Sequence, residues 1–132
     1  MNILAISTLP HYLTLAPLLV NRNYNKEYNY IYSSIILYST TLSFLWHLSN
    51  EENNVLFIMD YFGAFLWLLF EIGYSIHSKN ESIIYKVFIL NNIIYYLNKT
   101  CDFVPREHYL VCHSAWHIIS SIKCIYIAKL LN

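Results

Sequence analysis

Apolar residues fall into five long runs, and short polar segments separate them. The runs cover residues 2–20, 30–49, 54–76, 83–97 and 109–131. A helix needs about 20 mostly apolar residues to cross the hydrocarbon core of a bilayer, and four of the runs reach roughly that length. Short connections are typical of antiparallel neighbours in an up-and-down bundle. The pattern therefore predicts an all-α, polytopic transmembrane bundle of about five spans, which forms a single domain over residues 1–132.

The composition agrees with a location in the membrane. Of the 132 residues, 57% are hydrophobic and only 12% are charged, and the mean hydropathy is +0.38. So few charges would not cover the surface of a soluble globule. The net charge is zero, so no basic surface for a nucleic acid is expected. We expect an integral, multi-pass membrane protein with no nucleic-acid partner.

A few ionisable and polar side chains interrupt the apolar runs. The second run contains Ser43-x-x-x-His47, the third contains Asp60, and the fifth contains His113-x-x-x-His117. An ionisable side chain at the centre of a bilayer costs roughly 2.5–3.5 kcal/mol, so such residues usually face a partner or a cavity. In an antiparallel bundle of five spans all five residues lie at a similar depth, near one face of the membrane. This convergence predicts a site.

The residue types favour a metal ion. Residues four apart share a helix face, so His113 and His117 can present two imidazoles to one ion, and His47 can supply a third. Three histidine ligands suit Zn²⁺, which keeps its fourth position for water in catalytic sites. Bound zinc lowers the pKa of that water to about 7 and so produces a nucleophile. Asp60 is a candidate general base for the water or a hydrogen-bond partner of a metal ligand. Ser43 is a candidate hydrogen-bond donor to the water or to a developing oxyanion.

The order of these motifs resembles the CREST superfamily, which includes alkaline ceramidases, progestin and adipoQ receptors, Per1-type proteins and myomaker-type proteins. The resemblance implies zinc on His47, His113 and His117, with Ser43 and Asp60 beside the bound water. It also implies a membrane lipid as substrate and hydrolysis of its amide or ester bond. Members of that superfamily typically have seven spans. The missing spans fall between Asp60 and His113. Three alternatives follow: a neighbouring copy of the chain completes the pocket, the pocket opens sideways to lipid, or the protein is a relic without turnover.

Two other classes of protein remain open from the sequence. One is a non-catalytic multi-pass protein, receptor-like or structural, in which zinc only joins helices. The other is a multi-pass protein without metal, whose histidines form hydrogen bonds between helices. Metal content separates the last class from the others, and lipid turnover that depends on Asp60 separates the hydrolase from the structural protein.

The remaining polar residues have simpler interpretations. Glu71 and Lys86 are nearly symmetric about the connection after the third run, which predicts an ion pair between them. Lys123 is expected to extend its ammonium group towards the membrane surface. His11 has no convergent partner in this pattern. The three cysteines, at positions 101, 112 and 124, form no CxxC motif and are expected to pack as small apolar side chains.

Overall fold

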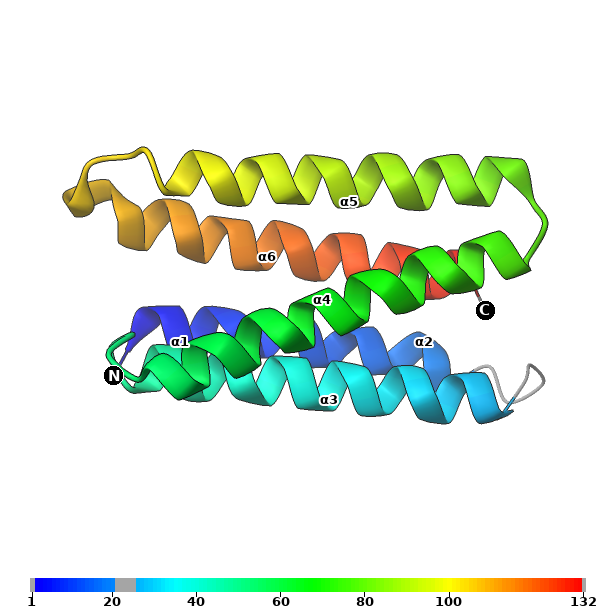
Figure 1. The fold of residues 1–132 in the computed structure, drawn as a ribbon, viewed down its shortest axis with the longest axis horizontal. Helices are drawn as coiled ribbons and strands as arrows, with labels where there is room; N and C mark the ends of the chain where they lie inside the picture. The colour runs from blue at the N-terminus through cyan, green and yellow to red at the C-terminus, as the bar shows by residue number, and fades with distance from the viewer. Residues whose placement is uncertain (1, 21–25, 132) are drawn as a thin grey trace.

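The computed structural model describes residues 2–20 and 26–131, and all regular structure in these ranges is helical (Figure 1). The predicted all-α class is therefore confirmed. The helix over the fourth apolar run is longer than its apolar core, because polar residues extend it at both ends. The elements are α1 (Ile3–Thr8), a 3₁₀ helix η1 (Leu9–Thr14), α2 (Leu15–Val20), α3 (Lys26–Leu48), α4 (Asn54–His77), α5 (Glu81–Cys101) and α6 (Arg106–Leu131).

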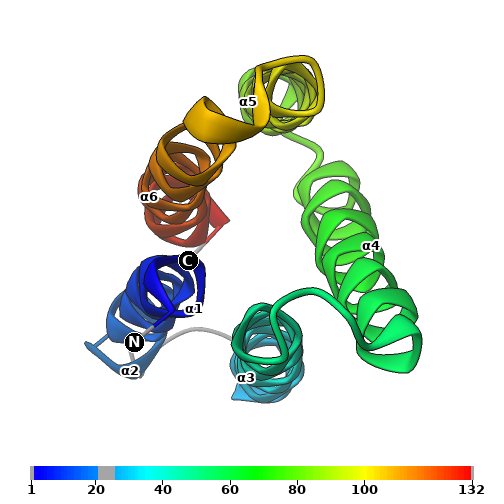
Figure 2. The same cartoon turned by 90° about the vertical axis from the view of Figure 1, so that its left-hand side faces the viewer.

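The helices form a ring of antiparallel rods. The segments α1, η1 and α2 follow one another along one side, and the later helices run back and forth beside them (Figure 1). Seen from the end, the order around the ring follows the chain, and α6 closes it against α1 (Figure 2). Helix α4 crosses the bundle at a slant, close to α3 where it begins and close to α5 where it ends. The first half of α4 is therefore close to α3 and further from α5.

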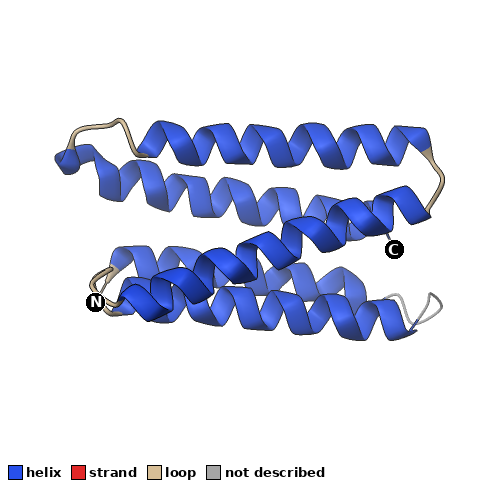
Figure 3. Cartoon of the chain, in the orientation of Figure 1, coloured by secondary structure: helices blue, strands red, loops and turns tan. Residues whose placement is uncertain are grey.

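Short loops join consecutive helices (Figure 3), and asparagine side chains cap the starts of several of them. Asn53 accepts hydrogen bonds from the backbone amides of Val55 and Leu56 at the start of α4. Asn80 does the same at the start of α5. Each cap satisfies backbone donors that have no partner inside the helix, which stabilises a helix by about 1 kcal/mol. The helix boundaries are thus set by local chemistry as well as by the apolar runs.

Two helices, α4 and α6, are long and apolar enough to cross a membrane by their length and composition. The N-terminal apolar segment, Ile3–Leu19, is shorter. Among the described residues, no other helix meets both requirements. The coarse prediction of apolar, membrane-length helices is therefore supported for two of the five rods.

Large apolar side chains lie both on the outside of the bundle and in a buried cluster that includes Ile36, Val87 and Ile127. Large apolar side chains cover the outside of α4, α5 and α6, and many are more than half exposed. Examples are Ile58 at 66%, Phe88 at 58% and Val111 at 72%. The interior also holds many polar side chains, among them Ser7, Thr8, Thr14, Ser39, Thr40, Ser75, Ser120 and Ser121.

A charged network occupies the middle of the bundle. The carboxylate of Glu71, which is fully buried, accepts hydrogen bonds from the Tyr32 hydroxyl (2.8 Å) and the Trp67 indole (2.8 Å) at one oxygen. Its other oxygen accepts from Asn91 (2.9 Å) and from the Lys123 ammonium (3.2 Å). Lys123 also donates to the Asn91 side-chain oxygen at 2.9 Å. These contacts join α3, α4, α5 and α6 through one carboxylate.

This network corrects two predictions from the sequence. Glu71 pairs with Lys123 of α6 and not with Lys86, whose side chain is exposed on α5. Lys123 does not extend to the surface, because its side chain is only 9% exposed. The symmetry of the α4–α5 hairpin could suggest a partner only on the next helix in the sequence. Lys123 comes from α6, which reaches Glu71 because the helices form a closed ring.

The close approach of α3 and α4 depends on Gly63. A Cβ atom at this position would lie 3.0 Å from the Cα atom of Ser39 and 3.2 Å from its Cβ atom. Since the nearest atom belongs to the backbone, the two helices would have to separate. Gly73, one turn beyond Leu69 on the same helix, has no atom within 4 Å of such a Cβ.

We expect Gly63→Ala to reduce the stability of the protein by about 1–2 kcal/mol, because overpacking outweighs the better helix propensity of alanine. Gly73→Ala is the matched control and should leave stability unchanged or raise it by up to about 1 kcal/mol. Thermal unfolding of the two variants in detergent measures the difference. Equal midpoints would show that the α3–α4 contact is not tight at Gly63.

We expect Lys123→Met to destabilise the protein by roughly 3–5 kcal/mol, because it leaves a buried carboxylate without its cation. Lys86→Met removes the partner that the sequence suggested and should have little effect. Unfolding midpoints of both variants test the assignment. A larger loss of stability in Lys86→Met than in Lys123→Met would instead support an ion pair between Glu71 and Lys86.

Candidate metal centre

Three helices bring the five candidate residues together. Ser43 and His47 lie in the C-terminal half of α3, Asp60 in the second turn of α4, and His113 and His117 in the first half of α6. All five line one cavity. The antiparallel arrangement places them at the same end of the bundle, as the order of the apolar runs predicts.

The three histidines form a compact, buried cluster. Each offers one ring nitrogen, and these three atoms lie within 4.8 Å of one another. The Nε2 atoms of His47 and His117 are 3.0 Å apart, close to the separation of about 3.3 Å that two nitrogen ligands have on one tetrahedral zinc ion. His47, His113 and His117 are 0%, 7% and 3% exposed. The cluster could hold a metal ion.

Glu51 fixes the protonation of His47. The Nδ1 atom of His47 lies 2.8 Å from a carboxylate oxygen of Glu51. A carboxylate only accepts, so Nδ1 carries the proton and Nε2 keeps its lone pair for a ligand. The same hydrogen bond lowers the pKa of the Glu51 carboxyl group. Carboxylate–histidine pairs of this kind orient metal ligands and raise their basicity.

The backbone after α3 makes this contact. Asn50 and Glu51 both adopt left-handed conformations, with φ of 56° and 63°, and turn the chain back over the end of the helix. The amide of Glu51 donates to the carbonyl of Trp46, which holds the turn in place. From sequence, Glu51 resembles a loop charge. Its spacing of four residues from His47 could have predicted this contact, although the helix ends before Glu51.

Asp60 and Ser43 line the same cavity from two neighbouring helices. Ser43 lies on α3, one turn before His47, and Asp60 lies on α4, which packs against α3. Neither residue belongs to the histidine cluster itself. The cavity therefore combines three nitrogen ligands with a carboxyl group and a hydroxyl group.

The cavity is about 370 Å³ in volume, within the range of about 300–1,000 Å³ usual for small-molecule sites. Its wall includes Tyr61 and Phe65 of α4 and Tyr95 of α5. These three side chains are also 50–57% exposed on the outside of the bundle. Because residues of both helices line the cavity and also lie on the outer surface, the cavity reaches that surface between α4 and α5. The slant of α4 separates the ribbons of the two helices at this end of the bundle (Figure 2).

His11 is a cavity residue that the sequence pattern missed. It is 8% exposed, and its ring packs edge-on against His117 at a centroid distance of 5.7 Å. Its Nδ1 atom is 3.0 Å from the carbonyl of Thr8, so Nδ1 carries the proton and donates. The 3₁₀ segment η1, which begins beside Pro10, turns this side chain inward. Spacing alone does not reveal such a local change of helix type.

No protein-family model, no curated protein and no solved structure matches this chain.

We expect the purified protein to bind about one zinc ion per chain, and His113→Ala and His117→Ala to reduce the bound metal at least tenfold. The reason is that each variant removes one of three converging nitrogens. His108→Ala is the control, because His108 lies on the same helix with its side chain 69% exposed. Elemental analysis after dialysis against a weak chelator gives the stoichiometry. Equal zinc in all four proteins would rule out this site.

We expect Glu51→Gln to weaken metal affinity by about 10–100-fold while the fold is retained, since an amide orients His47 less firmly than a carboxylate does. Glu52→Gln, at the neighbouring exposed position, should leave affinity unchanged. Competition with a fluorescent zinc chelator measures both. Matching affinities would mean that Glu51 does not act through His47.

Proposed function

We propose that this protein is an integral-membrane, zinc-dependent hydrolase that acts on an amide or ester bond of a lipid. The observation that carries the proposal is the arrangement of the cavity. Three buried histidine nitrogens lie within 4.8 Å of one another, and a carboxyl–hydroxyl pair, Asp60 and Ser43, lines the same cavity. The resemblance of the motif order to the CREST superfamily points to the same chemistry.

The surface of the bundle supports a multi-pass protein in a bilayer. Its outer face is apolar, and polar and charged side chains lie inside, as is expected where lipid is the solvent. The lateral mouth between α4 and α5 supports a lipid as the ligand, because it opens onto this apolar surface. The opening also fits a bundle with two spans fewer than the seven that are typical of the superfamily. A second copy of the chain seated over the mouth would complete the wall.

In this proposal, each group in the cavity has a separate role in the hydrolysis. Zinc, when bound, would polarise the lipid carbonyl group and make water a better nucleophile. Asp60 accepts the proton that water loses as it attacks the carbonyl carbon, and then returns a proton to the departing amine or alcohol. Ser43 donates a hydrogen bond to Asp60 and orients it. The apolar wall of the cavity holds the acyl chain and excludes bulk water.

We expect Asp60→Asn to keep its metal and to lose activity by about 10²–10⁴-fold, because the amide preserves the shape of the site but accepts no proton. Asp102→Asn is the control, at an exposed acidic position outside the cavity. The assay follows release of a fluorescent fatty acid from a long-chain ceramide and from a matching acyl ester in mixed micelles, with zinc content measured in parallel.

The wild-type protein decides between the hydrolase and the non-catalytic alternative. Hydrolysis of either lipid that disappears in Asp60→Asn supports the enzyme. A zinc-loaded protein that cleaves neither lipid contradicts it and favours a structural metal site.

A further inference from the structure

Two of the three cysteines meet at the end of the bundle that holds the histidine cluster. Cys101 is the last residue of α5 and is 1% exposed, with its thiol 3.4 Å from the carbonyl of Leu97. Cys112 lies in the second turn of α6 and is half-buried. The two cysteines thus lie on two helices that pack against each other, near the end of one and the start of the other. No sequence motif signals this pairing, because ten residues separate the two positions.

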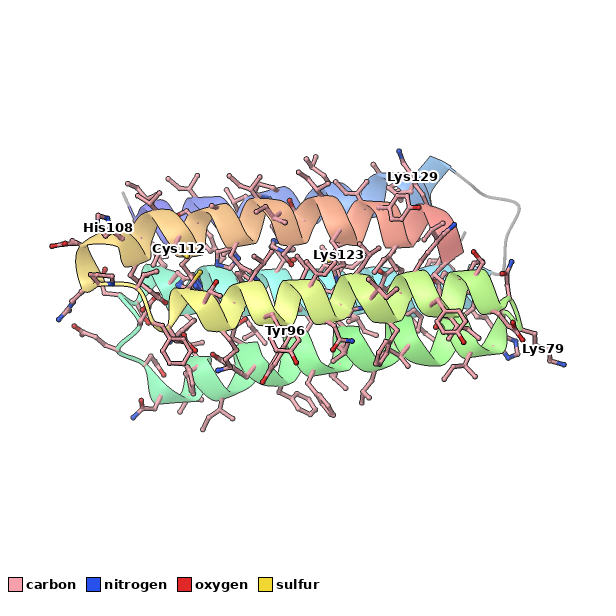
Figure 4. All side chains as sticks on the ribbon, turned by 90° about the horizontal axis from the view of Figure 1, so that it is seen from above. Lys79, Tyr96, His108, Cys112, Lys123 and Lys129 are labelled. Atoms are coloured by element: carbon pink, nitrogen blue, oxygen red, sulfur yellow. The ribbon has the colours of Figure 1, made fainter. Side chains whose placement is uncertain are left out.

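The shape of the α5–α6 connection explains the contact. The chain continues beyond the end of α5 before α6 begins, so α6 starts further along the bundle axis than α5 ends (Figure 1). The second turn of α6 is therefore level with the last turn of α5. Figure 4 shows Cys112 beside the end of α5. Cys124 lies twelve residues further along α6, among the buried residues of the core.

We propose that Cys101 and Cys112 form an intramolecular disulfide when the protein meets a small disulfide oxidant such as oxidised glutathione. The more accessible Cys112 thiolate attacks the oxidant, which forms a mixed disulfide and releases one reduced glutathione. The Cys101 thiolate then attacks the Cys112 sulfur, which forms the protein disulfide and releases the second glutathione. The two thiol protons end on the two glutathione molecules.

The disulfide would fasten the start of α6 to the end of α5. Cys112 directly precedes His113 in the sequence, so the bond lies beside the helix turn that supplies two of the three clustered histidines. The bond would join two helices that already pack side by side. The modification depends on the position of the thiols and not on a bound metal or on any catalytic activity.

The test incubates the full-length protein in detergent with oxidised glutathione, blocks the remaining thiols and maps tryptic peptides. Cleavage after Lys99, Arg106 and Lys123 puts the three cysteines on separate peptides. We expect residues 100–106 to be recovered linked to residues 107–123 without reduction, with Cys124 alone blocked. Cys124→Ser should give the same link, and Cys112→Ser should abolish it.

Three outcomes would overturn the proposal. One is recovery of all three thiols in the blocked form after oxidation. Another is a stable glutathione adduct on Cys112, which would show that Cys101 cannot reach it. The third is a disulfide between two chains, seen as a dimer on a non-reducing gel, in place of the link within one chain.

Discussion

The Glu71 carboxylate is the constraint on which the arrangement of the bundle depends. Four donors meet at its two oxygens, one from its own helix and three from neighbouring helices, and one of them, Lys123, carries the compensating charge. An unpaired charge in an apolar bundle would cost several kcal/mol, so these helices must keep one register to satisfy it. Apolar packing alone supplies less specificity, because it is not directional. The register that Glu71 imposes also sets the height at which the histidines meet.

The helix positions could be predicted from the sequence because they depend on local properties. Apolar runs of helical length, separated by short polar segments, indicate helices before any tertiary contact is known. The convergence of His47, His113 and His117 followed from helix direction and the four-residue spacing. Neither feature depends on which helices contact each other. The positions of the helices and the meeting of the three histidines could therefore be predicted from the order of the segments along the chain.

The features that the sequence did not reveal depend on contacts around the ring. The partner of Glu71 comes from the last helix and not from its hairpin neighbour. The place of His11 in the cavity depends on a 3₁₀ segment, and the contact of Glu51 with His47 depends on two left-handed residues. The meeting of Cys101 and Cys112 depends on how far the chain runs between two helices. Each of these four contacts arises only from the folded bundle, and no periodic pattern of residues in the sequence predicts it.

The slant of α4 has a kinetic consequence for a ligand of the cavity. In the proposed membrane location, an opening between α4 and α5 faces the lipid around the bundle and not the aqueous phase beyond its ends. A lipid that enters this way diffuses in two dimensions, so occupancy follows its mole fraction in the bilayer and not its total concentration in solution. Dilution with inert lipid at constant total concentration would then slow capture. The exposed aromatic rings at the mouth are the first protein groups that such a molecule meets.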